Sequence, residues 1–381
     1  MLLSEEQVLI QEMARRFARE RLLPTAAERD RTGRFPAELL AEMGQLGLLG
    51  MVVSPEWDGA GADLVAYALA IEEIAAGDGG ISTIMSVHNS VGCGPIAKFG
   101  TPAQKEQFLR PMARGEWLGA FCLTEPQAGS DAAALKSRAR RDGDHYVLTG
   151  SKQFITSGQH ARVAIVFAVT EPDAGRKGIS AFIVPTDTPG YEVARHEEKL
   201  GQHDSETCQI VLNACRIPVA QRLGEEGDGY RIALANLEGG RIGIAAQAVG
   251  MARAAYHHAL LYAQERQTFG RAIIQHQAVA FRLADMATRI EAARHLVLHA
   301  ACLRQAGRPC LKEASMAKLF ASEMAEQVVS QALQTLGGYG YLKDFPLERI
   351  YRDVRVCQIY EGTSDIQRLI IAREILDDHQ A

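Results

Sequence analysis

The chain has 381 residues, of which 47% are hydrophobic, and this length and composition allow two or three domains with a substantial core. Its formal net charge of −5 excludes the strongly basic surface of a nucleic-acid-binding protein. No apolar run approaches the roughly 20 residues of a membrane helix, and the first residues lack the basic and apolar regions of a signal peptide. We therefore predict a cytoplasmic protein that binds neither nucleic acid nor membranes.

Residues 1–116 are predicted to form a helical domain. Ser4 and Gln7 fit a capping box, and Leu9, Met13 and Phe17 then recur every fourth residue. Pro24 is expected to close this first helical segment. Further helix-like stretches cover residues 36–47, 63–76, 81–98 and 102–114.

The pattern changes near Trp117, and residues 117–228 are predicted to form a β domain, either a barrel or a sandwich. Short apolar or alternating runs lie at residues 145–149, 153–156, 163–169, 179–185 and 209–212. Turn signals separate the runs, at Asp142-Gly143, Thr149-Gly150, Ala174-Gly175 and Pro189-Gly190. The glycine-rich residues 224–229 are expected to form a flexible connector.

Residues 229–381 return to long amphipathic helices. One helix carries a single apolar face, as in a helix bundle, formed by Val279, Leu283, Met286, Ile290, Ala293 and Val297. The predicted fold is therefore mainly α with a middle β domain, in the order helical domain, β barrel or sandwich, helix bundle.

Cysteine and histidine spacing gives no sign of a metal centre. The seven cysteines are scattered without a CxxC pair, which predicts buried thiols in a reducing compartment and neither disulfides nor a zinc site. His295 and His299 would share one face of a helix, but the residues between them lack the glutamate of a zinc protease and no third ligand is apparent. We expect no metal site.

The run from Ile359 to Asp365 contains the strongest candidate for a catalytic group. Apolar neighbours remove water from the Glu361 carboxylate, which raises its pKa toward the range of a general base. Gly362 has no Cβ and allows a ligand to approach closely, where the Glu361 N–H is available as a donor. A structural glutamate on a tight turn between two helices fits these seven residues equally well.

Residues 92–97 match the letters of a dinucleotide-binding fingerprint. Such a loop must follow a strand and begin a helix, whereas this one follows a helix-like stretch and contains Pro95. We therefore reject it as a nucleotide site.

Two segments of the β domain offer groups suited to a phosphate or a flat heterocycle. Residues 121–131 place Thr124 at a strand end and follow it with the backbone N–H groups and hydroxyl of Gly129-Ser130. Phe154 and Thr156 lie two residues apart, so their side chains share one side of a strand. Either segment alone is also explained by a packed turn with satisfied hydroxyls.

Three further segments combine helix ends with polar groups. Residues 334–340 end a helix with glycines, which is typical of a C-cap. Residues 266–270 end another with Arg266 and an aromatic ring. Arg241 is a candidate cation for an anionic ligand.

Taken together, the segments FCLTEPQAGSD, FITSG, ERQTFG, QTLGGYG and IYEGTSDIQRLIIARE resemble the acyl-CoA dehydrogenase family in order and spacing, over essentially the whole chain. The resemblance implies an N-terminal helical domain, a middle β domain and a C-terminal four-helix bundle, usually assembled as a homotetramer. It also implies FAD bound without a Rossmann loop, an acyl-CoA substrate, and electron-transfer flavoprotein as the electron acceptor.

Carried over by their segments, several groups of residues are expected at the site. The FAD contacts from the β domain would be Phe121, Leu123, Thr124, Ser130, Phe154, Ile155 and Thr156. A neighbouring subunit would contribute Arg266, Phe269, Gln277, Gln334, Gly337 and Gly338. Beside the base, FAD would meet Thr363, Ser364 and Asp365. The acyl-CoA would meet Ser130, Glu238, Gly240, Arg241 and Gly362.

The resemblance also implies a mechanism. Glu361 would remove the α-proton of the thioester while the β-hydrogen leaves as hydride to the flavin, giving a trans-2-enoyl-CoA. The enolate oxygen would be stabilised by the Glu361 N–H and a flavin ribityl hydroxyl. One branch of the family carries its base just before the arginine aligned with Arg241, but this sequence has Gly240 there, which assigns the base to Glu361. Glu238 lies at a position that looks structural.

The sequence departs from the family pattern at a few positions. Phe154 replaces a more common Trp, and Asp365 replaces a longer Gln or Glu. Residues 201–205 differ from the usual basic and small residues, with no evident reason. Residues 84–90 and 239–245 look closest to short-chain and short-branched-chain members, so we expect a short acyl-CoA, with fatty-acid or branched-chain amino-acid breakdown as the pathway.

Three other readings compete with this one. An acyl-CoA oxidase would share the base and the flavin but would pass electrons to oxygen, and its usual extra C-terminal domain is missing here. A flavoprotein relative without CoA chemistry is disfavoured by Glu361 and the acidic charge. A non-catalytic helical scaffold would take up no FAD.

Overall fold

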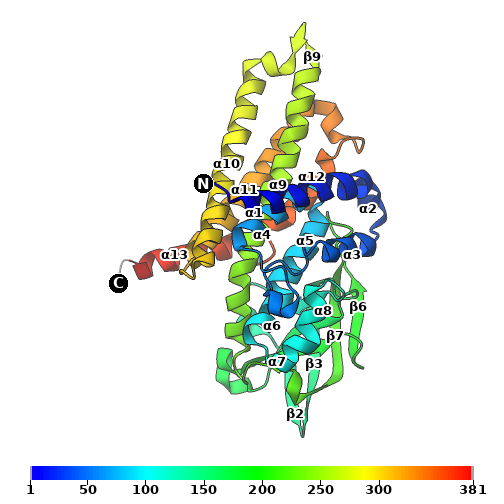
Figure 1. Cartoon of the computed structure of the whole chain (residues 1–381), viewed down its shortest axis with the longest axis vertical. Helices are drawn as coiled ribbons and strands as arrows, with labels where there is room; N and C mark the ends of the chain where they lie inside the picture. Colours follow the sequence, from blue (N-terminus) through cyan, green and yellow to red (C-terminus); the bar gives the residue numbers. More distant parts are fainter. Residues whose placement is uncertain (1, 379–381) are drawn as a thin grey trace.

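We describe residues 2–378 of a computed structural model, which has a sheet at one end and a helix bundle at the other (Figure 1). The first part of the chain is helical. Its helices, joined by short 3-10 and π-helical turns, are α1 (Glu5–Phe17), α2 (Ala26–Thr32), α3 (Ala37–Gln45), α4 (Leu64–Gly77), α5 (Gly79–Val87), α6 (Gly94–Phe99), α7 (Pro102–Gln104) and α8 (Arg110–Ala113).

The first helix begins as predicted but does not end as predicted. Ser4 and Gln7 form both bonds of the capping box. Pro24, however, occupies an early position in a short 3-10 turn, and the chain continues directly into α2. Proline lacks an N–H, but the first turn of a helix does not use that donor, so Pro24 is accommodated where one helix passes into the next. The expectation that Pro24 closes the segment is wrong.

The middle of the chain forms one sheet. Its path is β6-β7-β3-β2-β4-β5-β8, and β1 pairs with β4 in parallel. The strands are β1 (Gly119–Cys122), β2 (Arg138–Asp142), β3 (His145–Thr156), β4 (Val163–Val169), β5 (Ile179–Pro185), β6 (Tyr191–His196), β7 (Thr207–Pro218) and β8 (Arg222–Leu223).

The residues of β4 alternate between two cores. Val163, Ile165 and Phe167 pack with the helical segments around Phe108 on one face. Ala164, Val166 and Ala168 face a second cluster, to which β2, β3, β5 and β7 also contribute. The period of two along the strand therefore fixes which face meets the helices.

Two predictions for this region need correction. Thr149-Gly150 is not a turn, because β3 runs through it with a register shift, and a Cβ on Gly150 would lie 2.2 Å from the Ser137 hydroxyl. Residues 224–229 are not a flexible connector either. The N–H of Gly227 donates to Ser180 at 3.0 Å, and Tyr146 bonds Glu226, so the segment is fixed to the sheet.

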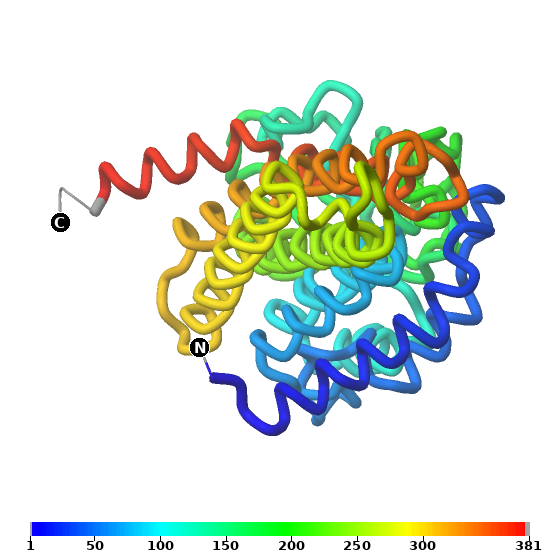
Figure 2. Tube along the Cα trace, turned by 90° about the horizontal axis from the view of Figure 1, so that it is seen from above, coloured from blue at the N-terminus to red at the C-terminus, as the bar shows by residue number. Residues whose placement is uncertain are grey.

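The last part of the chain is a helix bundle with a small hairpin at its tip (Figures 1 and 2). Its elements are α9 (Gly229–Glu265), β9 (Gln267–Thr268), β10 (Arg271–Ala272), α10 (Gln277–Gln305), α11 (Leu311–Leu336), α12 (Leu347–Val354) and α13 (Ser364–Asp378). The predicted apolar face of α10 is confirmed, since Leu283, Met286, Ile290, Ala293 and Val297 are buried. Helix α13 projects away from the body in both views.

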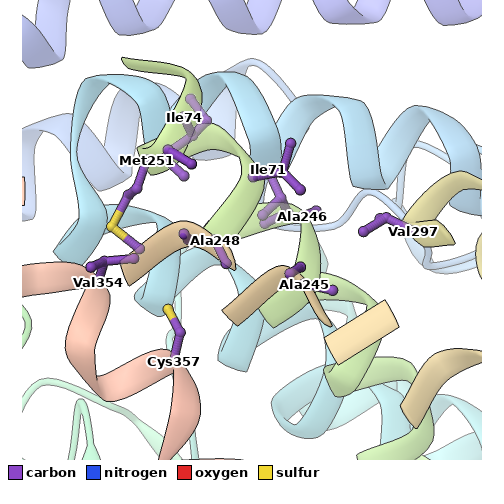
Figure 3. Packing of buried hydrophobic residues seen from close by; sticks show 14 of the residues in the cluster. Ile71, Ile74, Ala245, Ala246, Ala248, Met251, Val297, Val354 and Cys357 are labelled. Atoms are coloured by element: carbon purple, nitrogen blue, oxygen red, sulfur yellow. The ribbon is translucent and has the colours of Figure 1, made fainter. Parts of the chain in front are cut away.

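One core joins the first helices to this bundle. Figure 3 shows Ile71 and Ile74 of α4 beside Ala245, Ala246, Ala248 and Met251 of α9. Small residues allow close packing here, because a Cβ on Gly250 would lie only 2.2 Å from the carbonyl oxygen of Glu72. Six of the seven cysteines are buried. Among residues 2–378, no helix combines the length and the apolar character needed to cross a bilayer.

Candidate active site

Glu361 lies on a tight turn between α12 and α13. Its φ is +51° and that of Gly362 is +90°, so both residues occupy the left-handed region that favours glycine. Both carboxylate oxygens of Glu361 are buried without a hydrogen-bond partner among the described residues. Burial raises the pKa of this carboxyl to about 7, although the charges of Lys318 and Arg241 oppose the rise. A strained backbone that holds an unpaired buried carboxylate is typical of a functional site.

The carboxylate rests against helix α9 at Gly240. A Cβ built on Gly240 would lie 1.9 Å from Oε2 of Glu361, which is well inside van der Waals contact. The place that a side chain at position 240 would occupy is therefore filled by the Glu361 carboxylate. A base on α9 and a base at position 361 exclude each other sterically in this fold.

Two polar side chains that sequence reasoning missed hold the turn. Lys318, buried on α11, donates to the Gly362 carbonyl at 2.7 Å. Gln367 of α13 donates to the same oxygen at 2.9 Å and to the Glu361 carbonyl at 3.3 Å. Burial lowers the pKa of Lys318 to about 8. The only sequence signal was a lysine among the small and mostly apolar residues of one helix face.

Tyr360, just before Glu361, is fixed by a buried polar network. Its hydroxyl donates to Gln247 at 2.5 Å and lies 3.3 Å from the Thr83 hydroxyl. Thr83 in turn donates to Gln202 at 2.7 Å. The network links the turn to α5, to α9 and to the loop before β7.

A cleft of about 190 Å³ separates this turn from the β domain. Thr156, at the end of β3, lines one side, and Ile359 and Tyr360 line the other. Residues 199–202, with Ser205 and Thr207, form its floor. The predicted Thr156 hydroxyl therefore lines the same cleft as the two residues that precede the base, whereas Glu361 itself is not one of the lining residues.

Residues 201–205, for which the sequence offered no reason, have a structural one. A Cβ on Gly201 would lie 2.5 Å from the carbonyl carbon of Arg352, so only glycine fits. Gln202 has φ +51°, and its N–H donates to the Asp353 carboxylate at 2.5 Å. Asp204 is buried and pairs with Arg29 at 3.0 Å. These contacts hold the floor of the cleft against the helices.

The segment from Phe121 to Ser130 is shaped by a buried ion pair. Lys152 donates to Glu125 at 2.8 Å, and Glu125 also accepts from the N–H groups of Lys136 and Ser137. Burial alone would raise the pKa of Glu125, but the Lys152 charge and these hydrogen bonds bring it down to about 2. Sequence reasoning missed both members of this pair.

Individual side chains of the predicted FAD segments lie in different surroundings. Phe121 packs against Phe167, with ring centroids 5.0 Å apart, and Leu123 is buried. Ile155 is buried in the β-domain core, whereas Phe154 is 64% exposed with φ +59°. Thr124 is half-buried, and Ser130 is exposed.

The structure does not bring Arg266, Phe269 and their companions to this cleft. The β9–β10 hairpin carries Phe269, which is 96% exposed, and lies at the tip of the molecule opposite the sheet (Figure 1). Gln277, Gln334, Gly337 and Gly338 begin or end helices of the same bundle. Within one chain these residues form a separate group.

The predicted substrate residues on α9 are largely buried. Glu238 forms a salt bridge of 3.0 Å with Arg304 and accepts from Cys310, as expected of a structural residue. Arg241 is buried, and its Nε has no partner among the described residues. Its charge acts on Glu361, so it belongs to the surroundings of the base.

Beyond the base, Thr363 precedes α13 and Ser364 is its first residue, while Asp365 is mostly exposed. The Thr363 hydroxyl accepts from Ile366 at 3.3 Å, and Ser364 Oγ is buried without a partner in the described part of the chain. Asp365 is 90% exposed and lies 3.8 Å from Arg368.

A helical, β, helical fold with a buried carboxylate of raised pKa is the arrangement that the sequence resemblance implied for an FAD-dependent dehydrogenase. Residues 4–116, 120–215 and 227–376 match the N-terminal, middle and C-terminal domain families of acyl-CoA dehydrogenases. The chain belongs to the acyl-CoA dehydrogenase family.

Among similar proteins, an acyl-CoA dehydrogenase of Bacillus subtilis is 52% identical over 373 residues, covering 98% of each chain. The mitochondrial short-chain specific acyl-CoA dehydrogenase of Bos taurus is 47% identical over all of this chain and 92% of its own length. Butyryl-CoA dehydrogenase from Megasphaera elsdenii superposes with a TM-score of 0.97 at 42% identity, over 99% of both chains. A chain from a structure of the electron transferring flavoprotein of Acidaminococcus fermentans has a TM-score of 0.98 at 45% identity, over 99% of both chains.

Proposed function

We propose that this protein catalyses the α,β-dehydrogenation of a short-chain acyl-CoA, giving the trans-2-enoyl-CoA. The observation that carries the proposal is the buried, unpaired Glu361 carboxylate, which directly follows the cleft-lining residues Ile359 and Tyr360. Relatives at 42–47% identity are named for short-chain or butyryl-CoA substrates, which supports the short acyl group. The alternatives of an oxidase or a flavoprotein without CoA chemistry are not favoured by the relatives of 45–52% identity, which are named acyl-CoA dehydrogenases.

In this proposal Glu361 takes the α-proton of the thioester. A pKa of about 7 lets the carboxylate be ionised at neutral pH and still accept a proton readily. Lys318 and Gln367 hold the turn, so that the Glu361 N–H is the proposed donor to the thioester oxygen. Gly240 has no side chain, so the Glu361 carboxylate can lie against helix α9. Gly362 allows the thioester to approach.

FAD, when bound, supplies the acceptor for the hydrogen that leaves the β-carbon. We assign its ring to the cleft between Thr156 and Tyr360, because Thr156 of a predicted FAD segment lines that cleft. The Ser364 hydroxyl, which is buried without a partner among the described residues, is a further proposed FAD contact. The remaining FAD contacts from this chain are proposed for the segment 121–130 and for Phe154, Ile155, Thr363 and Asp365. The proposed acyl-CoA contacts are Ser130, Glu238, Gly240, Arg241 and Gly362.

We further propose that the protein works as a homotetramer. Helix α13, which begins at the base's turn, projects from the body and exposes Leu369 and Leu376 by 66% and 61%. Phe269 and Tyr341 at the bundle end are 96% and 87% exposed. Apolar groups this exposed indicate an interface, and a second copy would bring the predicted FAD residues of the bundle to the cofactor of its neighbour.

The remaining functional assignments follow from the family. We propose domains at residues 1–116, 117–228 and 229–381, a cytoplasmic location, and a role in acyl-chain β-oxidation. Electron-transfer flavoprotein is the proposed electron acceptor, supported by the similarity to the chain from the Acidaminococcus structure.

Replacing Glu361 by Gln tests the base directly. Glutamine keeps the shape of the side chain but cannot take a proton, so we expect flavin reduction by butyryl-CoA to slow by at least about 10²–10⁴-fold. The measurement is anaerobic bleaching of the flavin in stopped flow, with butyryl-CoA binding followed separately. If the variant bleached its flavin at a near wild-type rate, Glu361 would not be the catalytic base.

Substrate length is tested by the same bleaching assay across straight and branched acyl-CoAs. We expect four-carbon and five-carbon thioesters to reduce the flavin fastest, and a maximum at eight or more carbons would refute the short-chain assignment.

A further inference from the structure

A cluster of metal-ligating side chains lies at the edge of the sheet, outside the proposed catalytic residues. His196 ends strand β6, and Cys208 lies directly opposite it on β7 in the antiparallel register. Directly opposed residues of such a pair have neighbouring side chains. Glu206 precedes β7 by one residue and reaches the same point.

The ligand atoms of these three residues are close enough to share one ion. His196 Nδ1 lies 3.8 Å from Cys208 Sγ and 3.9 Å from Glu206 Oε2, and all three atoms lie within 4.8 Å of one another. Tetrahedral zinc, with bonds of about 2.0–2.3 Å, places its ligand atoms roughly 3.3–3.8 Å apart. To bind zinc, the three ligand atoms have to move closer together by about 1 Å or less. The His196 side chain is 54% exposed, so its ring has room to rotate.

The carboxylate is already oriented by its own partners. Glu206 Oε1 accepts from the N–H groups of Gln159 and His160, both at 2.9 Å. The His160 ring lies 2.8 Å from Oε2 and stacks on Phe35 with centroids 3.8 Å apart. Hydrogen bonds of this kind orient the ligands of metal sites.

We propose that His196, Glu206 and Cys208 bind a zinc ion, with water in the fourth position. Thiolate, imidazole and carboxylate together suit zinc better than magnesium or calcium, which prefer oxygen ligands alone. Cys208 loses its thiol proton to solvent when the Zn–S bond forms. Burial and the Glu206 charge raise the pKa of the free thiol to about 12, so the ion itself has to stabilise the thiolate. The ion ties the edge strand β6 to β7.

The spacing of these residues in the sequence does not predict a metal site. The ligands lie 10 and 2 positions apart along the chain, and strand pairing brings them together. Glu206 and Cys208 flank Thr207, which lines the cleft, so the ion would also fix one wall of the catalytic cleft.

Equilibrium dialysis of the FAD-loaded protein against zinc tests the proposal. After removal of metal with a chelator, we expect about one zinc per chain by atomic emission, and a thiolate-to-metal charge-transfer band on adding cadmium. His196→Asn and Cys208→Ser should each weaken zinc binding at least about tenfold, and Cys208→Ser should abolish the band.

The matched control is His295→Asn. His295 is similarly exposed and lies 3.2 Å from Glu291, but it is not part of a described cluster with a thiol. This variant should bind zinc as the wild type does. Wild-type protein without zinc, or zinc binding unchanged in His196→Asn, would overturn the proposal, even if Cys208→Ser does not fold. Because the readout is metal content, it is independent of dehydrogenase activity.

Discussion

At the scale of single residues, the protein buries an ionisable group where its charged form is disfavoured. The Glu361 carboxyl is buried and unpaired, and its pKa is raised from 4.5 to about 7. A raised pKa means that the folded protein binds this proton more tightly than the unfolded chain does. The stability that it contributes is complete below pH 4.5 and is lost as the pH rises through 7.

The sign of this linkage makes Glu361→Gln a stability test as well. Relative to the wild type, the variant should gain up to about 3 kcal/mol in free energy of unfolding between pH 4.5 and pH 8. Denaturant titrations of both proteins at several pH values measure the difference. A difference that does not change with pH would show that Glu361 titrates normally.

Gly240 sets the position of the base from the opposite side. Alanine at this position would place its Cβ 1.9 Å from the carboxylate, which must move by an ångström or more. We expect Gly240→Ala to slow flavin bleaching by about 10²-fold, since a misplacement of roughly 1 Å has that effect. The control is Gly239→Ala, whose Cβ would lie 3.4 Å from Arg304, an ordinary contact. Equal rates in the two variants would contradict the steric argument.

At the scale of elements, three segments converge on the base. Helix α9 provides the surface on which the carboxylate rests, α11 provides Lys318, and α13 provides Gln367. The turn itself is only a short link, and its left-handed residues are held by hydrogen bonds from these helices. The helix bundle therefore acts as a rigid frame for a strained turn.

Lys318→Met tests how α11 tunes the base. Removing this buried charge should raise the pKa of Glu361, because Lys318 opposes the effect of burial. The midpoint of the rise of the bleaching rate with pH should move upward by about 1 unit or more. Lys343→Met, at an exposed position of the same bundle, should leave the profile in place. If the pH midpoint of bleaching did not change in Lys318→Met, the lysine would have only a structural role.

At the scale of the whole molecule, a buried arginine joins parts that are far apart in the sequence. Arg29 of α2 pairs with Asp78, which caps α5, at 2.5 Å, and with Asp204, the residue before the cleft-lining Ser205, at 3.0 Å. Burial and the neighbouring Asp78 raise the pKa of Asp204 well above its usual range. The first helices and the β domain are thus tied together beside the cleft.

Arg29→Met leaves two carboxylates buried without their cation. We expect a loss of about 3–5 kcal/mol in stability, smaller at pH 5 than at pH 8 because Asp204 can then take a proton. Thermal unfolding monitored by circular dichroism measures the loss. Arg21→Met, which breaks the exposed pair with Glu42, should change the midpoint little. If both variants lowered the unfolding midpoint by a similar amount, the burial of the Arg29 ion pairs would not contribute to stability as argued.

The sequence by itself determined what depends on local pattern. The order of helical, β and helical segments, the capping box at Ser4 and the apolar face of α10 were all predicted, because periodicity and capping act within a few residues. The family was recognisable from five short segments. Glu361 was a candidate because its apolar neighbours are adjacent in the chain.

Only the tertiary structure decided what depends on distant packing. Gly240, Lys318 and Glu361 meet although more than forty residues separate each from the next, and Lys152 pairs with Glu125, which lies 27 positions earlier in the chain. The chain continues through Pro24 into a further helix, and Thr149-Gly150 lies within a strand. In both cases contacts with neighbouring elements determine the structure, and local propensity does not include those contacts. Buried charges and ligand clusters acquire their chemistry from partners in space, and a single sequence does not record those partners.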